Sequence, residues 1–309
     1  MANDLREADR RYLRALAAHL GDDSQDVQPP FEGRVEVDGI SLRYLDWGLP
    51  EASPLVLLHG GGQSARTWDA CCLTLARHYR CLALDQRGHG DSGWSPQANY
   101  GFDDHAADIA GFIAALGLRA PLLIGMSMGG INAIAAATRD DVRLRGLVTV
   151  DVGPDLQFDA VDRLLRGLGA YRDFDSPAQA ASRMSALGAR RDPVLLEATL
   201  RHNLRESDNG RWIWKYDPQT LINLTTAEIL DPRQALWPRL PAIRCPVLVV
   251  RGADSEIFSS ADADKLTSAL PDGHCVTVPA ARHSVQTDNP GGLAAVIMSF
   301  DQGLRACRS

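Results

Sequence analysis

Short, continuous apolar runs separated by longer amphipathic stretches recur along most of this 309-residue chain. Runs without polar alternation are typical of strands buried on both faces, and helices between such strands imply parallel crossovers. A hairpin with its turn at Asp38-Gly39 precedes these runs. The pattern therefore predicts an α/β protein with a doubly wound, mostly parallel sheet. The predicted core strands are residues 55–59, 80–85, 121–126, 144–150, 246–251 and 274–279.

The same pattern divides the chain into three parts. Residues 1–30 contain an amphipathic helix, predicted over 3–20, and a polar linker. Residues 31–152 and 244–309 hold the predicted strands and form the α/β core. Residues 153–243 lack the strand pattern and lie between strands whose carboxyl ends should meet at the ligand-binding edge of the sheet. We expect this insertion to be a helical cap over the site.

Composition narrows the class of protein. The chain is 45% hydrophobic and 23% charged, as globular enzymes are, and its net charge of -7 includes no basic cluster for nucleic acid. The charged N-terminus lacks the apolar segment of a signal peptide, and no apolar run approaches the roughly 18 residues of a membrane span. The six cysteines form no CxxC or metal-ligand spacing. We expect a cytoplasmic protein without metal or other cofactor, and the sequence leaves its oligomeric state open.

A serine between glycines is the first candidate for chemistry. An apolar run ends in Gly125-Met-Ser127-Met-Gly129, and an Ala-rich helical stretch follows at once. Such a tight strand-to-helix turn strains the serine backbone and lifts its hydroxyl clear of the sheet, while any side chain at the glycines would collide with neighbouring elements. This context makes Ser127 a candidate nucleophile.

Three further segments follow predicted strands in the same way. They are His59-Gly-Gly-Gly-Gln-Ser64, Asp85-Gln-Arg-Gly-His-Gly-Asp-Ser92 and Pro279-Ala-Ala-Arg-His-Ser284. Together with the serine turn, and in the same order, they closely resemble the α/β-hydrolase family over roughly residues 31 to 305. The resemblance implies a cofactor-independent hydrolase with a serine nucleophile, a histidine base and an orienting acid.

A serine hydroxyl is a weak nucleophile at neutral pH and needs a base within hydrogen-bond reach, which histidine supplies because its pKa lies near the working pH. His283 follows the last strand, where the family has its catalytic histidine, whereas His59 and His89 match positions that are structural in the family. Backbone N–H groups must also hold the oxyanion. The resemblance assigns this role to Met128 and to Gly61, with Gly62 as the alternative to Gly61.

The orienting acid has more than one candidate. After the late strand the family usually places an aspartate three residues beyond a glycine, but here that position holds Ser255, with Asp254 and Glu256 on either side. Some family members take the acid from the end of an earlier strand, where this chain has Asp151, 24 residues past Ser127. We favour Asp151, with Asp254 as the alternative and Glu256 after it.

Three tryptophans are candidates for substrate contacts. Trp68 lies one helical stretch past the glycine-rich loop and could line the acyl pocket, with core packing as the alternative. Trp212 and Trp214 belong to an aromatic cluster of the insertion, which could form an apolar substrate wall or pack the cap against the core.

These features predict a serine hydrolase that cleaves a carboxylic ester of a bulky apolar or aromatic substrate, for example a monoalkyl phthalate, through an acyl-enzyme. The serine argues against epoxide hydrolysis and dehalogenation, for which the family places an aspartate at this turn. A lactonase or a C–C bond hydrolase of ring-fission products would use the same residues. A small-molecule binding protein on a hydrolase scaffold is the alternative from another class.

Overall fold

An eight-stranded sheet forms the centre of the computed structural model, which describes residues 2–22, 27–186, 193–221 and 224–306. The strand order is β1-β2-β4-β3-β5-β6-β10-β11, and pairing is antiparallel only where β2 meets β1 and β4. The predicted mostly parallel sheet is therefore confirmed. The strands are β1 Phe31–Val37, β2 Ile40–Trp47, β3 Pro54–Leu58, β4 Arg80–Leu84, β5 Leu122–Met126, β6 Gly146–Val150, β10 Val247–Gly252 and β11 Gly273–Val278.

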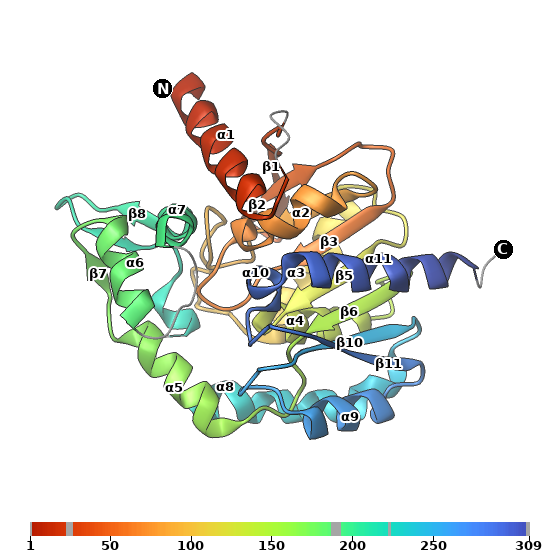
Figure 1. Cartoon of the computed structure of the whole chain (residues 1–309). Helices are drawn as coiled ribbons and strands as arrows, with labels where there is room; N and C mark the ends of the chain where they lie inside the picture. The colour runs from red at the N-terminus through yellow and green to blue at the C-terminus, as the bar shows by residue number, and fades with distance from the viewer. Residues whose placement is uncertain (1, 23–26, 187–192, 222–223, 307–309) are drawn as a thin grey trace.

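Helices cover both faces of the sheet (Figure 1). In β3, Leu55 and Leu57 pack into the hydrophobic core on one face, while Val56 and Leu58 pack into the core on the other. Both faces are dry, which explains why the strand sequences are continuously apolar. One face is covered by α2 Asp69–Leu75 and α11 Pro290–Ala306, the other by α3 Phe102–Ala115, α4 Met128–Ala137 and α9 Ser260–Ala269.

The insertion between β6 and β10 is mostly helical, as predicted, and it also contains a short sheet that the sequence did not indicate. It contains a three-stranded antiparallel sheet in the order β7-β9-β8. These strands have only two or three residues each, too few to produce a periodic signal in the sequence. The elements are α5 Phe158–Gly169, β7 Asp173–Phe174, α6 Pro177–Ala186, α7 Pro193–Asn203, β8 Leu204–Glu206, β9 Trp212–Trp214, η2 Pro218–Thr220, α8 Thr226–Leu230 and η3 Asp231–Ala242.

The two ends of the predicted insertion differ in their packing. The small sheet with α6 and α7 lies to one side of the main sheet (Figure 1) and has its own hydrophobic cluster. The 3-10 helix η3, in contrast, packs on α4 and α9, and Leu236 and Leu240 lie in the main core. The last part of 153–243 therefore belongs physically to the α/β core.

The N-terminal helix α1 Ala2–His19 packs against α2 of the core and α7 of the insertion. Leu13, Leu16 and Ala17 bury its apolar face, and Asp9 pairs with Arg66 of the 3-10 helix η1 Ala65–Trp68. The helix thus connects the two parts of the molecule. In the part of the chain that the structure describes, no helix combines the length and apolarity needed to cross a membrane.

A buried ion pair ties the amino-terminal edge of the sheet to α11. The Arg145 guanidinium, just before β6, donates to the Asp301 carboxylate at 2.6 Å and to the Pro54 carbonyl at 2.6 Å. Asp301 is fully buried and also accepts from Arg305 at 2.8 Å, whose side chain is 56% exposed. The Asp301 carboxylate therefore has one buried and one exposed cationic partner, and their contributions to the free energy of unfolding can be compared.

We predict that Asp301→Asn lowers the free energy of unfolding by about 3 kcal/mol, because it leaves the Arg145 cation buried without a counter-charge. Arg305→Gln, the matched control, should cost no more than about 0.5 kcal/mol, since exposed i,i+4 pairs contribute little. Urea unfolding followed by circular dichroism measures both. Equal losses in the two variants would show that the buried pair has no special role.

Candidate active site

Ser127 lies at the turn between β5 and α4, with φ of 51° and ψ of -121°. A Cβ atom at Gly125 would lie 2.2 Å from the carbonyl oxygen of Gly129, and one at Gly129 would lie 2.5 Å from that of Leu58. These are backbone contacts that cannot move aside without disrupting the sheet, so the turn requires its glycines. The strained conformation leaves Ser127 partly exposed at the carboxyl edge of the sheet.

The structure brings Ser127, His283 and Asp151 together. His283 lies between β11 and α10 Val285–Asp288, with its Nε2 atom 3.0 Å from the Ser127 Oγ and its Nδ1 atom 2.9 Å from the Asp151 Oδ2. The His283 side chain is 15% exposed and that of Asp151 is fully buried. A carboxylate can only accept at Nδ1–H, so Nε2 is left unprotonated and faces the serine hydroxyl.

Asp151 is held by groups from the neighbouring strand end. It follows β6 with φ of 53°, and its Oδ1 accepts from the Gly252 N–H at 2.8 Å. Its Oδ2 accepts from the Ser255 hydroxyl at 2.5 Å as well as from His283. Ser255, at the family's usual acid position, therefore donates a hydrogen bond to the acid that replaces it. The sequence pointed to this residue but not to this contact.

The other two acid candidates lie elsewhere. Asp254 and Glu256 are both exposed, and Glu256 pairs with Arg163 of α5 at 2.9 Å. Among the described residues, neither carboxylate hydrogen-bonds to His283. Ser255 is buried against Asp151, whereas its two neighbours in this turn are exposed.

Two backbone N–H groups are candidates for an oxyanion hole. Met128 is the first residue of α4, so its N–H has no acceptor within the helix. Gly61 lies in the loop after β3, and within the described part of the chain its N–H meets no protein acceptor. The adjacent Gly60 lies beside the nucleophile, since a Cβ there would be 3.4 Å from that of Ser127. Its own N–H is occupied by the Gln63 side chain at 3.2 Å.

A buried network fixes this loop to the nucleophile's helix. The His59 Nε2 accepts from the Gln86 N–H at 3.0 Å, and burial lowers the pKa of His59 to about 4. The Gln86 amide donates to the His59 carbonyl at 2.7 Å and accepts from Asn132 of α4 at 2.8 Å. His59 is thus a neutral structural group, in agreement with its expected role.

Sequence reasoning missed a contact between the histidine loop and the glycine-rich loop. Gln286 is fully buried, three residues past His283, and its amide donates to the Thr67 hydroxyl at 2.9 Å and to the Gln63 Oε1 at 3.4 Å. The same Gln63 oxygen accepts from Gly60. No motif marks these glutamines, because their pairing exists only after the two loops have folded together.

The structure corrects the expected substrate contact of Trp68, and it places Trp212 and Trp214 in packing contacts within the insertion. Trp68 is fully buried in the core beneath α2. Trp214 packs edge-on against Phe174 with ring centroids 5.2 Å apart and donates to the Tyr171 carbonyl at 3.0 Å, while Trp212 lies under the Arg201 guanidinium. Trp68 therefore packs in the core, and Trp212 and Trp214 pack within the insertion.

Other residues of the insertion approach the glycine-rich loop. A Cβ at Gly61 would lie 2.9 Å from the Leu221 side chain, and one at Gly62 would lie 3.5 Å from Tyr216 and 3.9 Å from Leu168. These three largely apolar side chains border the glycine-rich loop. Leu168 comes from α5, and Tyr216 and Leu221 come from the loops on either side of η2.

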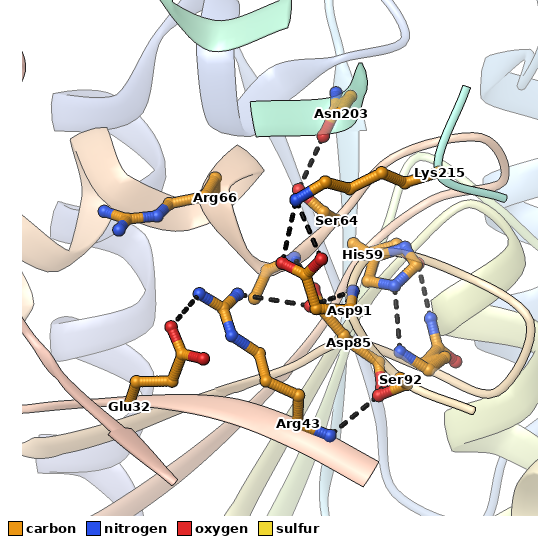
Figure 2. Close-up of polar contacts among 12 residues, drawn as sticks. Glu32, Arg43, His59, Ser64, Arg66, Asp85, Asp91, Ser92, Asn203 and Lys215 are labelled. Carbon is orange, nitrogen blue, oxygen red and sulfur yellow. Dashed lines mark hydrogen bonds and ion pairs between the residues drawn. The ribbon is translucent and has the colours of Figure 1, made fainter. Parts of the chain in front are cut away.

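Polar contacts anchor the insertion to the loops of the core, as Figure 2 shows. Lys215, just after β9, pairs with Asp91 at 2.8 Å, and Asn203 accepts from the Ser64 hydroxyl at 2.5 Å. Beneath them, the buried Asp85 accepts from Arg43 at 3.1 Å and from the Ala65 N–H at 2.6 Å. The residues flanking the glycine-rich loop are thereby fixed to both parts of the molecule.

Within the described residues, no group of three His, Cys, Asp or Glu side chains is arranged to hold a metal ion.

Comparisons with known proteins identify the family. A model of the alpha/beta hydrolase family matches residues 55–296. The chain belongs to the α/β-hydrolase family. It is 32% identical to esterase Rv0045c of Mycobacterium tuberculosis over 271 residues, which cover 85% of this chain and 87% of that protein. It is 30% identical to a 3-hydroxybutyrate-oligomer hydrolase of Cupriavidus necator over 271 residues, which cover 84% of this chain and 92% of that protein.

Solved structures agree with this family and confirm the predicted fold. The M. tuberculosis esterase Rv0045c superposes with a TM-score of 0.76 at 29% identity, covering 94% of this chain and 97% of that one. E-2-(acetamidomethylene)succinate hydrolase superposes with a TM-score of 0.78 at 25% identity, covering 88% of this chain and 99% of that one.

Proposed function

We propose that this protein is a serine hydrolase that cleaves a carboxylic ester through an acyl-enzyme on Ser127. The observation that carries the proposal is the continuous line of hydrogen bonds from the Ser127 hydroxyl through His283 to the buried Asp151. The similarity to esterase Rv0045c supports the same enzyme class. In this proposal, residues 153–243 cover the site as a cap, and the enzyme is cytoplasmic and needs no cofactor.

The proposed reaction has two halves. The Ser127 Oγ attacks the ester carbonyl carbon while the His283 Nε2 accepts the hydroxyl proton, and Asp151 stabilises the imidazolium that forms. The N–H groups of Met128 and Gly61 hold the oxyanion. Collapse of the tetrahedral intermediate releases the alcohol, which takes the proton from His283. A water molecule, activated by the same histidine, then attacks the acyl-enzyme and frees the carboxylic acid.

The boundary of the site suggests the substrate class. Leu168, Tyr216 and Leu221 approach the oxyanion loop, and all three present largely apolar surface. Hydrophobic walls with few polar groups favour a bulky apolar or aromatic ester. A monoalkyl phthalate is one ester of this kind.

We predict that a fluorophosphonate probe labels Ser127, because the probe requires a serine activated by a nearby base. Mass spectrometry of the digested protein locates the adduct, and Ser127→Ala should show none. A folded wild-type protein that resists the probe would contradict the proposal and favour a small-molecule binding protein.

We predict that Asp151→Asn lowers kcat by about 10⁴-fold, since His283 loses the charge that orients and stabilises it. Asp254→Asn, one residue from the usual acid position but exposed, should stay within about twofold of wild type because surface charges away from the reacting atoms contribute little.

The contact between Ser255 and Asp151 provides a second test of this acid. Adding Ser255→Asp to Asp151→Asn should restore at least about tenfold of the lost kcat, because it returns a carboxylate to the same hydrogen-bonded site. A loss caused by Asp254→Asn instead, or by neither variant, would show that the acid lies elsewhere.

We predict rapid turnover of chromogenic para-nitrophenyl esters and no cleavage of a dienoate ring-fission product. The similarity to esterase Rv0045c favours cleavage of an ester over cleavage of a C–C bond, although both reactions would use the same serine and histidine. Absorbance assays at equal enzyme concentration compare the two reactions. Faster dienoate cleavage would assign the enzyme to the C–C hydrolases.

A further inference from the structure

A small cavity of about 170 Å³ lies in the insertion, beside the aromatic residues of β9. Its walls include Trp94, Trp214 and Tyr216, together with the guanidinium-bearing side chains of Arg172 and Arg205. Sites for whole ligands usually measure 300–1,000 Å³, so a cavity of this size suits one part of a larger molecule.

Tyr216 links this cavity to the candidate active site. It lines the cavity, and its ring edge also lies against the glycine-rich loop, 3.5 Å from a Cβ placed at Gly62. The ring is stacked between His89 and Trp214, with centroids 6.0 and 5.9 Å away, so its position is fixed. A group bound in the cavity would therefore be separated from the oxyanion loop by a single side chain.

The Tyr216 hydroxyl has no hydrogen-bond partner among the described residues, although the residue is only 3% exposed. Buried tyrosine hydroxyls nearly always find a partner, because leaving one unpaired costs free energy. The group is thus available to an acceptor supplied by a ligand. Arg172 lines the same cavity as Tyr216.

The two arginines are also available. Neither Arg172 nor Arg205 forms an ion pair with any described carboxylate, whereas the neighbouring Arg211 pairs with both Asp173 and Asp175. Both arginines line the cavity and are exposed, so an anion that enters the cavity meets them without displacing a protein carboxylate. Guanidinium groups with a hydroxyl donor are suited to bind a carboxylate, and the aromatic walls to bind an apolar or aromatic group that carries it.

We infer that this cavity is a subsite for the part of the substrate remote from the scissile ester, and that this part carries a carboxylate. The preferred substrates would then be monoesters of dicarboxylic acids. This inference rests on the proposed ester hydrolysis and specifies its substrate class.

The test compares para-nitrophenyl monoesters of dicarboxylic acids of increasing length with neutral esters in which a methyl group replaces the free carboxylate. Wild-type enzyme should prefer the charged ester at one chain length. In Arg172→Gln and Arg205→Gln, the ratio of kcat/KM for the charged ester to that for the neutral ester should fall about tenfold, mainly through KM. Arg139→Gln, an exposed arginine paired with Asp141, is the control for general charge effects and should leave the ratio unchanged.

A direct binding measurement separates this inference from the proposed function. Ser127→Ala binds the charged ester without cleaving it, and calorimetry should show about tenfold weaker binding when Arg172→Gln or Tyr216→Phe is added. Tyr216→Phe should not lower the melting temperature, because it removes an unpaired hydroxyl and keeps the ring.

The possible failures are distinct. Hydrolysis of neither ester would overturn the proposed function. Hydrolysis of both esters without a preference, or equal effects of Arg139→Gln and Arg172→Gln, would overturn the carboxylate subsite alone.

Discussion

The close approach of α4 to β3 at the serine turn is the constraint on which the site depends. At Gly129 the backbone passes so near Leu58 and His59 that even a methyl group would collide with their carbonyl oxygens. The turn can therefore exist only in its strained form, with positive φ at Ser127. The surrounding sheet, dry on both faces, supplies the packing energy that holds this strain. A serine fixed in this way would lose little conformational freedom in the proposed reaction.

A buried anion beside this turn is stabilised by hydrogen bonds alone. Asp151 accepts from the Gly252 backbone, from Ser255 and from His283, and the structure shows no arginine or lysine paired with it among the described residues. Three donors can replace the water that a buried carboxylate has lost. The absence of a competing cation leaves the histidine as the group that gains most from the negative charge. The carboxylate holds the His283 ring with its Nε2 atom toward the Ser127 hydroxyl.

The sequence predicted the core well because each of its signals is local. Strand β5 is continuously apolar since both of its faces are buried, and the glycines around Ser127 are required by backbone contacts within the same turn. The preference for Asp151 also came from a local feature, a polar residue at a strand end. The insertion was predicted less well, because two-residue strands such as β7 have no period to detect. Leu221 and Gln286 acquire their neighbours only through tertiary contacts. The sequence around Trp68 would look the same whether this residue lined a pocket or packed in the core, where the structure places it.

The anchoring of the insertion connects substrate binding to the geometry of the reaction. Lys215 and Asn203 contact Asp91 and Ser64, on loops that flank the candidate oxyanion hole. Residue 216, which borders the site, directly follows the first of these anchors. A movement of the insertion would therefore displace the substrate wall and strain the glycine-rich loop at the same time. Because α1 packs on both the insertion and the core, it resists such a movement from the opposite side. The site is consequently preorganised by contacts between segments far apart in the sequence, and its selectivity should depend on these anchors as much as on the residues that touch the ester.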